Sequence, residues 1–387
     1  MKFIHTSDLH IGAQLYGYDR LEEQGRMLAR IADLAVESRV DALIVSGDVF
    51  DTTQPSNAAQ HLLASRLTRL RAAMPDIEFI VTSGNHDSAT RHEALAPVWL
   101  EAGIRMVGTF RSTDNYSHNI IEIPGKAFVI AVPYVNDRFM SPKAWQGILD
   151  AVAERNRSNL PVVMMAHLTV AGASWGGHDT YENYVGGIEI RPLASLGQGY
   201  DYLALGHIHT PQKAGPKARY SGSPMAHGFS ELYPHSVCLV DIAEHGADPS
   251  VTLLEMPVGI PLKDIPSKGS AVWKDVMKLL AKIPDDMRCY FRLIVEDDGK
   301  IPADWRARIS NALEGKQAMF CTMETRRKAV EAEAENRKAM TFEGLRTISP
   351  AELAGLYLKS RNIDMNDEMT DMFAEIMAEV EQNNREA

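Results

Sequence analysis

The stretch Ser83-Gly84-Asn85-His86-Asp87 decides how the rest of this sequence is interpreted. The three residues Phe79-Ile80-Val81, shortly before it, are aromatic and β-branched and predict a buried strand. Gly84 permits a sharp turn at the end of that strand, and the turn then presents an amide, an imidazole and a carboxylate. Functional loops often lie at strand ends, on the rim of a site. Taken alone, however, the same residues also suit an ordinary polar surface turn.

The composition narrows the class of protein. The chain has 387 residues, of which 45% are hydrophobic and 24% charged, as expected of a globular protein with two or three domains. Its three cysteines, Cys238, Cys289 and Cys321, are far apart, which argues against disulfides or a cysteine zinc site and predicts a reducing cytoplasm. The sequence begins directly in a strand-like segment and has no apolar run long enough for a membrane, so we expect no signal peptide and no membrane association.

The net charge of −11 bears on the choice of substrate. It gives no support to nucleic-acid binding, because phosphate contacts use Lys and Arg side chains. It does not exclude such binding either, because a metal cluster and a local basic groove can hold phosphates in an acidic protein.

Residues 1–258 alternate between predicted strands and helices. The expected strands are Lys2–Thr6, Ala42–Ser46, Phe79–Thr82, Ile104–Val107, Asn119–Ile123, Ala127–Pro133, Val162–Ala166, Tyr202–Leu205, Ser236–Asp241 and Val251–Met256. The expected helices are Arg20–Glu37, Asn57–Arg71, Arg91–Glu101 and Lys143–Glu154. Helices between the early strands predict parallel pairing, whereas the later strands follow one another more directly and predict antiparallel pairing. We expect an α/β fold of two packed sheets with helices outside.

A second region begins after the Pro- and Gly-rich stretch at 257–269, which predicts a domain boundary. Residues 259–325 contain a compact unit of two helices and two strands, expected at Ala271–Lys282, Cys289–Val295, Pro302–Leu313 and Ala318–Met323. The charged segment 326–348 has little apolar periodicity and predicts a solvated linker or helix.

The last segment, 349–387, has the pattern of amphipathic helices. Ser349-Pro350-Ala351-Glu352 combines an N-cap serine, a proline at the first helical position and a glutamate three residues after the cap. A later apolar stripe consists of Met369, Met372, Phe373, Ile376, Met377 and Val380. Such a stripe must be buried, either in the groove of a partner or against its own chain.

Polar side chains follow five of the predicted strands, at the point where each strand ends. In chain order they are Asp8 and His10, then Asp48 and Asp51, then Asn85, His86 and Asp87, then His167, and finally His207 and His209. In an α/β protein the carboxyl ends of strands meet at one crevice, where ligands bind. We therefore expect these side chains to lie close together.

The residue types suit a site with two metal ions. Carboxylate, imidazole and amide oxygen ligands favour Mn, Fe or Zn over a soft thiolate site. The Asp8-x-His10 and His207-x-His209 pairs each place both side chains on one face of an extended chain, so each pair can hold one centre. A bridging carboxylate between two ions about 4 Å apart is also needed, and Asp48 is the natural candidate.

Each motif has a simpler interpretation when it is taken alone. A single His-x-His is often incidental, Asp8-x-His10 could be a polar strand end, and Gly47-Asp48 could be a turn or a helix cap. Their joint occurrence after five strands favours the metal site. Of the other histidines, we expect His178 to be a loop residue or a substrate contact, and His227 and His235 to be structural or exposed.

These motifs resemble those of the calcineurin-like metallophosphoesterase superfamily. The matching residues are Asp8-x-His10, Gly47-Asp48-x-x-Asp51, Gly84-Asn85-His86-Asp87, His167 and Gly206-His207-x-His209. A narrower resemblance is to bacterial DNA-repair nucleases that work with an SMC-like ATPase. It is carried by Met1 to Gly12, Val185-Gly186-Gly187, Tyr202 to His209 with Pro211-Gln212, and Tyr220-Ser221-Gly222-Ser223-Pro224 with Phe229-Ser230-Glu231. The likeness covers roughly residues 1–323 in layout, and the tail more loosely.

The resemblance implies a role for each residue. Asp8, His10, Asp48 and His209 would hold one metal ion, and Asp48, Asn85, His167 and His207 would hold the other. His86 would be the catalytic residue, as general acid or as a group that steadies the transition state, and Asp87 would orient its ring. Asp51 departs from the pattern, because many relatives have histidine there. We interpret Asp51 as support for a ligand or as the start of a helix.

The resemblance also implies an architecture. It is a two-sheet metallophosphoesterase sandwich flanked by helices, with a small α+β capping domain and C-terminal helices. The nuclease domain would be 1–258 and the capping domain 259–325, followed by a linker at 326–348 and a partner-binding tail at 349–387.

The activity implied by the resemblance is a nuclease. It implies Mn²⁺ as the ion, and double-stranded DNA ends and hairpins as substrates for 3′→5′ exonuclease and endonuclease action. It further implies a homodimer within a heterotetramer whose ATPase subunits bind the tail. Two alternatives are a metallophosphatase or cyclic-nucleotide phosphodiesterase, which would need neither cap nor tail, and a non-enzymatic scaffold, which would be expected to lose ligands.

Overall fold

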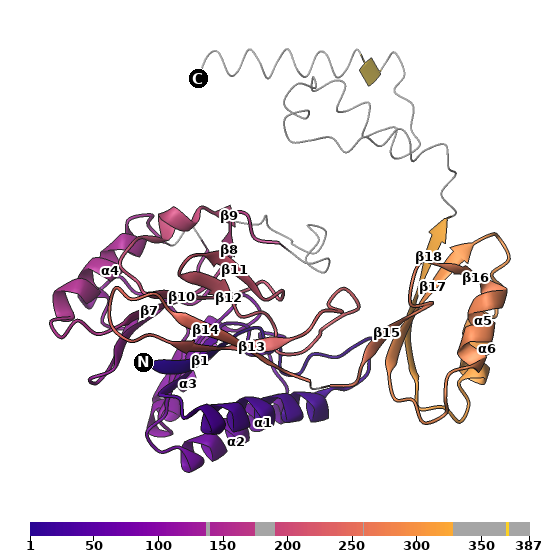
Figure 1. Cartoon of the computed structure of the whole chain (residues 1–387), viewed down its shortest axis with the longest axis horizontal. Helices are drawn as coiled ribbons and strands as arrows, with labels where there is room; N and C mark the ends of the chain where they lie inside the picture. Colours follow the sequence, from indigo (N-terminus) through magenta and orange to yellow (C-terminus); the bar gives the residue numbers. More distant parts are fainter. Residues whose placement is uncertain (137–139, 175–189, 258, 328–368, 371–387) are drawn as a thin grey trace. The chain divides into compact units, whose positions relative to one another are not determined.

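The computed structural model describes residues 1–136, 140–174, 190–257, 259–327 and 369–370 (Figure 1). Residues Met1–Arg326 form one compact unit, and Arg327–Ala387 form a second. Apart from residues 326, 327 and 369–370, the predicted linker and tail lie outside the described residues. His178 and Val185-Gly186-Gly187 lie outside them as well.

The first of two large sheets has the strand order β14-β13-β1-β2-β3-β4. These strands are β1 (Lys2–Thr6), β2 (Ala42–Ser46), β3 (Glu78–Thr82), β4 (Ile104–Val107), β13 (Ser236–Asp241) and β14 (Ser250–Glu255). Strands β1 to β4 are parallel, and β13 and β14 are antiparallel. The predicted parallel pairing of the early strands is therefore confirmed. It follows from the helix that lies in each connection.

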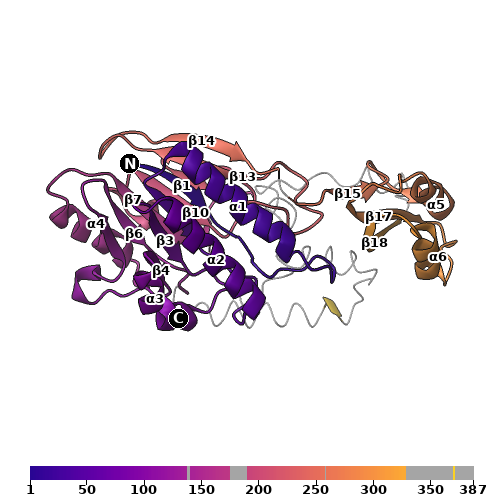
Figure 2. The same cartoon turned by 90° about the horizontal axis from the view of Figure 1, so that it is seen from below.

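Three helices connect the parallel strands of this sheet: α1 (Leu21–Ser38), α2 (Asn57–Ala73) and α3 (Ala89–Glu101). Ser56 and Ser88 cap α2 and α3 by accepting a backbone N–H in the first turn. Helices α1 and α2 lie side by side across the sheet (Figure 2). The apolar stripe of α1, which includes Leu28 and Ile31, packs with Leu63 of α2 on the sheet.

The second sheet has the strand order β11-β12-β10-β7-β6-β5. These strands are β5 (Ile120–Ile123), β6 (Ala127–Ala131), β7 (Val162–His167), β10 (Tyr202–Gly206), β11 (Gln212–Gly215) and β12 (Ala218–Tyr220). Helix α4 (Ala144–Arg155) packs on this sheet through Trp145, Ile148 and Leu149. A separate short pair is formed by β8 (Thr169–Val170) and β9 (Ile190–Arg191), and the 3₁₀ turns are η1 (Asp114–Tyr116) and η4 (Leu193–Leu196).

The expectation that the later strands pair antiparallel is wrong for most of the second sheet. Strands β6, β7, β10 and β12 are parallel, and only the edge pairs β5–β6 and β11–β12 are antiparallel. The reason is that α4 and a long connection allow the chain to cross over before β7 and β10. As a result, β7 and β10 also deliver their carboxyl ends to one edge of the sheet.

The two sheets pack face to face and bury an apolar layer that includes Phe3, Ile44, Val163 and Ala204. Helices cover the outer faces, so the molecule has the predicted α/β sandwich of two sheets flanked by helices. Among the described residues, no helix combines the length and the apolar character that spanning a membrane requires.

Residues 259–326 form a smaller α+β region, which we call the capping region. Its elements are β15 (Leu262–Ile265), β16 (Ala271–Val272), α5 (Trp273–Ala281), β17 (Tyr290–Asp297), α6 (Trp305–Ala312) and β18 (Met319–Arg327). Strand β17 pairs with β15, β16 and β18, and Val276, Leu280 and Phe291 lie in its apolar core. The predicted helix at Ala271–Lys282 begins later than expected, because Ala271 and Val272 pair with β17.

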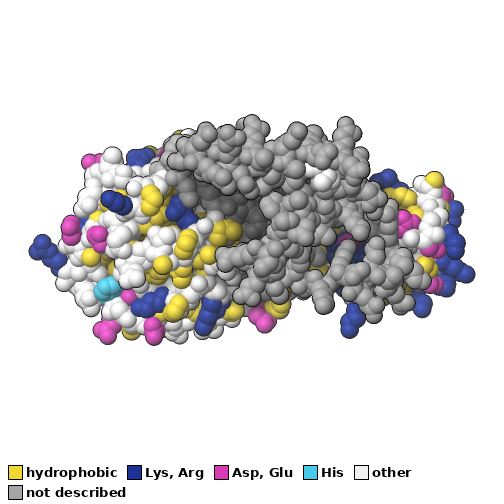
Figure 3. Space-filling view, turned by 90° about the horizontal axis from the view of Figure 1, so that it is seen from above, with side chains coloured by type: hydrophobic (Ala, Val, Ile, Leu, Met, Phe, Trp, Pro, Cys, Tyr) yellow, Lys and Arg dark blue, Asp and Glu magenta, His cyan; other side chains and the backbone are white. Residues whose placement is uncertain are grey.

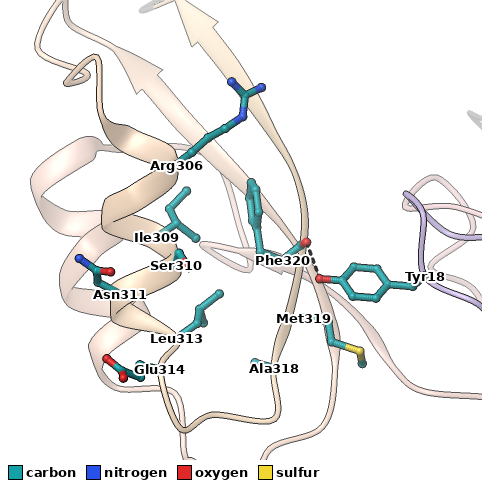
Figure 4. A pocket seen from close by; sticks show the side chains of 10 residues that line it. All are labelled: Tyr18, Arg306, Ile309, Ser310, Asn311, Leu313, Glu314, Ala318, Met319 and Phe320. Atoms are coloured by element: carbon teal, nitrogen blue, oxygen red, sulfur yellow. Dashed lines mark hydrogen bonds between the residues drawn. The ribbon is translucent and has the colours of Figure 1, made fainter.

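The capping region contacts the sandwich at the segment that precedes α1. The Tyr18 hydroxyl donates to the Phe320 carbonyl oxygen of β18 at 3.1 Å. Between Tyr18, α6 and β18 lies a pocket of about 700 Å³ (Figure 4). A second contact is buried: Glu23 of α1 accepts from the Ile260 backbone N–H at 2.6 Å and from the Tyr290 hydroxyl at 2.9 Å.

Candidate metal centre

All seven predicted metal ligands lie at or just after the ends of five parallel strands. Strand β1 leads to Asp8 and His10, β2 to Asp48, β3 to Asn85, β7 ends at His167, and β10 leads to His207 and His209. Five of the seven are buried, with exposed fractions between 0% for Asp8 and 7% for His207.

The backbone is strained at four of these positions. Asp8, His10, Asp48 and His207 have φ of 53°, 41°, 49° and 95°, in the left-handed region that side chains other than glycine rarely adopt. Such conformations cost roughly 1–3 kcal/mol each and persist where the surrounding structure imposes them, often at functional sites. The strain therefore marks these strand ends as a site.

One cluster, which we call the Asp48 group, consists of Asp48, Asn85, His167 and His207. His167 Nε2 lies 3.3 Å from Asp48 Oδ2 and 3.0 Å from Asn85 Oδ1. His207 Nδ1 lies 3.0 Å from the same Asn85 oxygen. Ligand atoms of Asp48, His167 and His207 all lie within 4.8 Å of one another, which is close enough for one ion.

The second cluster, which we call the Asp8 group, consists of Asp8, His10 and His209. Their ligand atoms also lie within 4.8 Å of one another, and His10 Nε2 is 3.2 Å from His209 Nε2. Asp8 is held in place by the His207 backbone N–H, which donates to its carboxylate at 3.0 and 3.2 Å. Asp48 lies between the two clusters, because its Oδ2 is also 3.6 Å from His10 Nε2.

The donor atoms fit a divalent cation. His167 Nδ1 lies 2.8 Å from the Ser46 carbonyl oxygen, which can only accept, so Nδ1 carries a proton and Nε2 is the nitrogen whose lone pair binds a metal when the metal displaces its proton. That lone pair faces the oxygens of Asp48 and Asn85, and a cation between such atoms relieves their repulsion. Nitrogen and oxygen ligands of this kind suit Mn, Fe or Zn.

The electrostatics of the Asp48 group also favour positive charge. Burial would lower the pKa of His167, but the neighbouring Asp48 carboxylate raises it to about 9. Burial would raise the pKa of Asp48, but His167 holds it well below its ordinary value. For His207, burial and then the neighbouring His167 lower the pKa to about 3, so its imidazole is neutral, which is the form that binds metals.

Two glycines allow these side chains to approach. A Cβ on Gly47, whose φ is +84°, would lie 2.2 Å from His167 Nδ1. A Cβ on Gly84 would lie 2.1 Å from Asp48 Oδ1. Packing at the Asp48 group therefore requires glycine at the first position of both motifs, Gly47-Asp48 and Gly84-Asn85-His86-Asp87.

His86 lies beside the clusters and is exposed. The prediction that Asp87 orients its ring is wrong. Asp87 is buried and accepts the backbone N–H groups of Val49, Phe50 and Gly84 at 2.9–3.0 Å, so it ties the loop after β2 to the loop after β3. The ring of His86 is instead positioned by the Asp51 carbonyl oxygen, 2.9 Å from Nδ1.

Asp51 contacts a predicted ligand through its side chain. Its Oδ1 lies 3.3 Å from His10 Nδ1, which agrees with the interpretation that it supports a ligand. The alternative that Asp51 starts a helix is wrong, because α2 begins at Asn57 and is capped by Ser56.

The structure adds His227 and Glu231 to the site. His227 Nε2 lies 3.2 Å from the Asp8 carbonyl oxygen, and its ring centroid is 4.8 Å from that of His10. Glu231 Oε1 lies 2.6 Å from His209 Nδ1. The sequence signal that could have indicated Glu231 was the stretch Phe229-Ser230-Glu231. It contributed to the narrower resemblance but suggested no role for Glu231 in the site.

Comparison with known proteins agrees with this site. Residues 1–211 match the family model of the calcineurin-like phosphoesterases. The SbcD subunit of the nuclease SbcCD from Rhodobacter capsulatus is 33% identical over 74% of this chain and 78% of its own length. The SbcD subunits of Bacillus subtilis and Escherichia coli are 31% and 27% identical, over 68% and 71% of this chain and 71% and 75% of their own lengths.

The fold and the site are thus those of a metal-dependent phosphoesterase. The chain belongs to the calcineurin-like phosphoesterase family, and within it to the SbcD subunits of SbcCD nucleases. Divalent metal ions follow from this family and from the two clusters of Asp and His side chains.

Proposed function

We propose that this chain is a Mn²⁺-dependent DNA nuclease with two metal ions. The observation that carries the proposal is the convergence of seven acceptor side chains at the ends of five strands. The relatives described above are named as the SbcD subunit of a nuclease, SbcCD, and this shared name supports DNA as the substrate.

Asp8, His10, Asp48 and His209 would hold one ion, and Asp48, Asn85, His167 and His207 the other, with Asp48 as the bridge. Bound divalent ions neutralise a phosphodiester and lower the pKa of water towards neutrality. The chain's own contribution is to hold the ligands: the Ser46 carbonyl fixes His167, and the His207 backbone N–H fixes Asp8.

His86 would be the catalytic residue. Because the Asp51 carbonyl oxygen can only accept, His86 Nδ1 carries a proton and Nε2 is the atom that can face a leaving oxygen. A protonated Nε2 would donate to that oxygen as the phosphodiester bond breaks. His86 also lies within reach of the clusters, since its ligand atom is within 4.8 Å of those of His10 and Asp48.

The proposed substrates are double-stranded DNA ends and hairpins, cut by 3′→5′ exonuclease and endonuclease action. The capping region supports this proposal, because residues 259–326 contain 12 Lys and Arg against 10 Asp and Glu in a chain of net charge −11. Figure 3 shows Lys and Arg side chains on the surface of this region. The exposed ones include Lys274, Lys278, Lys282, Arg288 and Arg306.

We also propose a cytoplasmic assembly that acts in DNA repair, recombination and replication. The tail at 349–387 would bind an SbcC-type SMC-like ATPase, within a heterotetramer that contains two copies of this chain. Exposed apolar side chains on α3, namely Leu95, Val98 and Leu100, support a contact between copies. A pull-down of the ATPase with and without residues 349–387 tests the role of the tail, and unchanged binding would contradict it.

The decisive experiment is degradation of linear duplex DNA, labelled at one end, by the purified chain in Mn²⁺. We expect cutting that needs the metal, with label release that follows the 3′→5′ direction. Cleavage of small phosphoesters alone, such as p-nitrophenyl phosphate or a cyclic nucleotide, would favour the alternative of a phosphatase or cyclic-nucleotide phosphodiesterase. Absence of any metal-dependent hydrolysis would favour a scaffold.

A further inference from the structure

Glu231 is a buried carboxylate in contact with the Asp8 group, and this inference, which concerns its role, rests on the proposed function. Its exposed fraction is 1%. One carboxylate oxygen, Oε1, lies 2.6 Å from His209 Nδ1, and the other, Oε2, accepts the His227 backbone N–H at 2.8 Å. Each of the two carboxylate oxygens of Glu231 therefore has a nitrogen partner.

The contact decides which nitrogen of His209 can bind a metal. Because Glu231 already accepts a backbone N–H, its carboxylate acts as the acceptor towards His209 as well, so His209 Nδ1 donates the proton and Nε2 is left to bind a metal. That nitrogen faces His10 Nε2 at 3.2 Å, within the cluster that includes Asp8. The other oxygen of Glu231, held by the His227 N–H, keeps the carboxylate from turning away.

Asp51 makes the corresponding contact to His10, and it provides a comparison within the same site. Its Oδ1 lies 3.3 Å from His10 Nδ1, but its side chain is 37% exposed, whereas that of Glu231 is 1% exposed. A solvated carboxylate at a longer distance orients a ring less firmly than a buried one at hydrogen-bond distance.

We propose that Glu231 is a positioning residue that fixes the ring orientation and tautomer of His209, and thereby sets the affinity of the ion held by the Asp8 group. Residues that hold the distal nitrogen of a ligand histidine typically change metal affinity 10–100-fold when they are replaced. Among the described residues, Glu231 makes no hydrogen bond to a side chain of the Asp48 group. Replacement of Glu231 should therefore change the affinity of the ion in the Asp48 group very little.

The test is titration of the full-length, chelator-treated protein with Mn²⁺, followed by calorimetry. We expect two ions in the unaltered protein. In Glu231→Gln we expect one ion at unchanged affinity and the other bound about 10–100-fold more weakly. Asp51→Asn should cause a smaller loss at the same ion, and Glu122→Gln, an exposed position on β5, should cause none.

Unchanged affinity for both ions in Glu231→Gln, or equal weakening of both, would overturn the inference. Circular dichroism of the metal-free proteins shows whether each variant folds. If Glu231→Gln does not fold, Glu231→Asp replaces it, because it keeps the charge but withdraws the carboxylate by roughly 1.5 Å. It should weaken one ion selectively, and two unchanged affinities would again contradict the role. Failure of the unaltered protein to bind Mn²⁺ would instead contradict the proposed function.

Discussion

The Asp48 group and the Asp8 group use similar ligands but are held in different ways. In the Asp48 group, a backbone carbonyl, that of Ser46, orients His167. In the Asp8 group, side-chain carboxylates orient the rings: Asp51 contacts His10, and Glu231 contacts His209. The first arrangement follows from the packing of β2 of one sheet against β7 of the other, whereas the second depends on loops that are remote in the sequence.

The Asp8 group is also connected to the capping region. Tyr290 and Ile260 both donate to Glu23, which pairs with the buried Arg20 at 3.2 Å. Arg20 in turn donates to the Ala226 carbonyl oxygen at 2.6 Å, next to His227. The comparison teaches that main-chain packing between the two sheets holds the ligand histidine of the Asp48 group, whereas the ligand histidines of the Asp8 group are held by side chains on loops that contact the rest of the chain. Four predictions test this difference, beginning with the largest expected effect.

Replacement of His86 should reduce catalysis but leave metal binding by the Asp48 group and the Asp8 group unchanged. In His86→Ala we expect DNA cleavage to fall about 10²–10⁴-fold, which is the usual contribution of a general acid. Both Mn²⁺ affinities should remain, because His86 is not among the proposed ligands. Rates on duplex DNA and Mn²⁺ calorimetry measure the two effects. His61→Ala, an exposed position on α2, is the control. Full activity of His86→Ala with both ions bound would refute the catalytic role.

A methyl group at Gly47 should disrupt the Asp48 group selectively. The added Cβ would lie 2.2 Å from His167 Nδ1, and overpacking of this kind costs roughly 1–3 kcal/mol. Gly125→Ala is a matched control, because its φ is also positive at +68° but no atom lies within 4 Å of the added Cβ. We expect Gly47→Ala to unfold at lower urea concentration than Gly125→Ala and to lose one ion. Equal stability of the two variants would mean that the contact with His167 does not constrain the site.

The metal-free protein should lose stability as pH falls from 6.5 to 5.0. Burial lowers the pKa of His5 and His207 to about 3, whereas in the unfolded chain it is about 6.5. Unfolding then takes up protons in this window, so stability is present above pH 6.5 and is lost towards pH 3, by up to about 2 kcal/mol per histidine at pH 5. His167 opposes this loss by only about 0.4 kcal/mol, because its pKa of about 9 keeps it protonated in the folded state while the unfolded chain completes its protonation between pH 6.5 and 5.0.

Urea unfolding at the two pH values, with chelator present, measures this loss. His5→Gln should reduce it, because the variant has one fewer buried imidazole that takes up a proton on unfolding. A stability that is the same at pH 6.5 and pH 5.0 would show that these histidines are not held neutral.

The smallest expected effect is at the connection to the capping region. Tyr290→Phe removes one hydrogen bond to Glu23 and should cost about 1 kcal/mol in unfolding free energy. It should also weaken only the ion of the Asp8 group, by less than Glu231→Gln does. Tyr18→Phe removes the other hydroxyl contact with the capping region and serves as control. Equal changes at both ions would argue against a separate connection to the Asp8 group.

Much of the sandwich could be predicted from local pattern. The strands at Lys2–Thr6, Ala42–Ser46 and Ile104–Val107 have the predicted bounds, because apolar runs between turn residues are a local signal. The short strands β8, β9, β11, β12, β15 and β16 were not predicted. Strands of only two to four residues carry little periodicity and depend on their neighbours for pairing.

The partners of the site residues could not be predicted in the same way. Asp87 adjoins His86 in sequence, and this proximity suggested a contact, but its carboxylate satisfies three buried backbone N–H groups instead. Buried backbone N–H groups need a hydrogen-bond acceptor, and for this reason the Asp87 side chain points towards them and not towards His86. Glu231 meets His209 only because a loop folds back between β12 and β13.

The sequence by itself determined which residues gather at the centre, beginning with Asn85 and His86 in the stretch after β3. Strand and turn propensities are local, and parallel strands bring their carboxyl ends together whatever the details of packing. The tertiary structure alone decided how each side chain is held: His86 by the Asp51 carbonyl, His167 by Ser46 and His209 by Glu231. Hydrogen bonds depend on positions within tenths of an ångström, and only the packing of distant segments sets such positions.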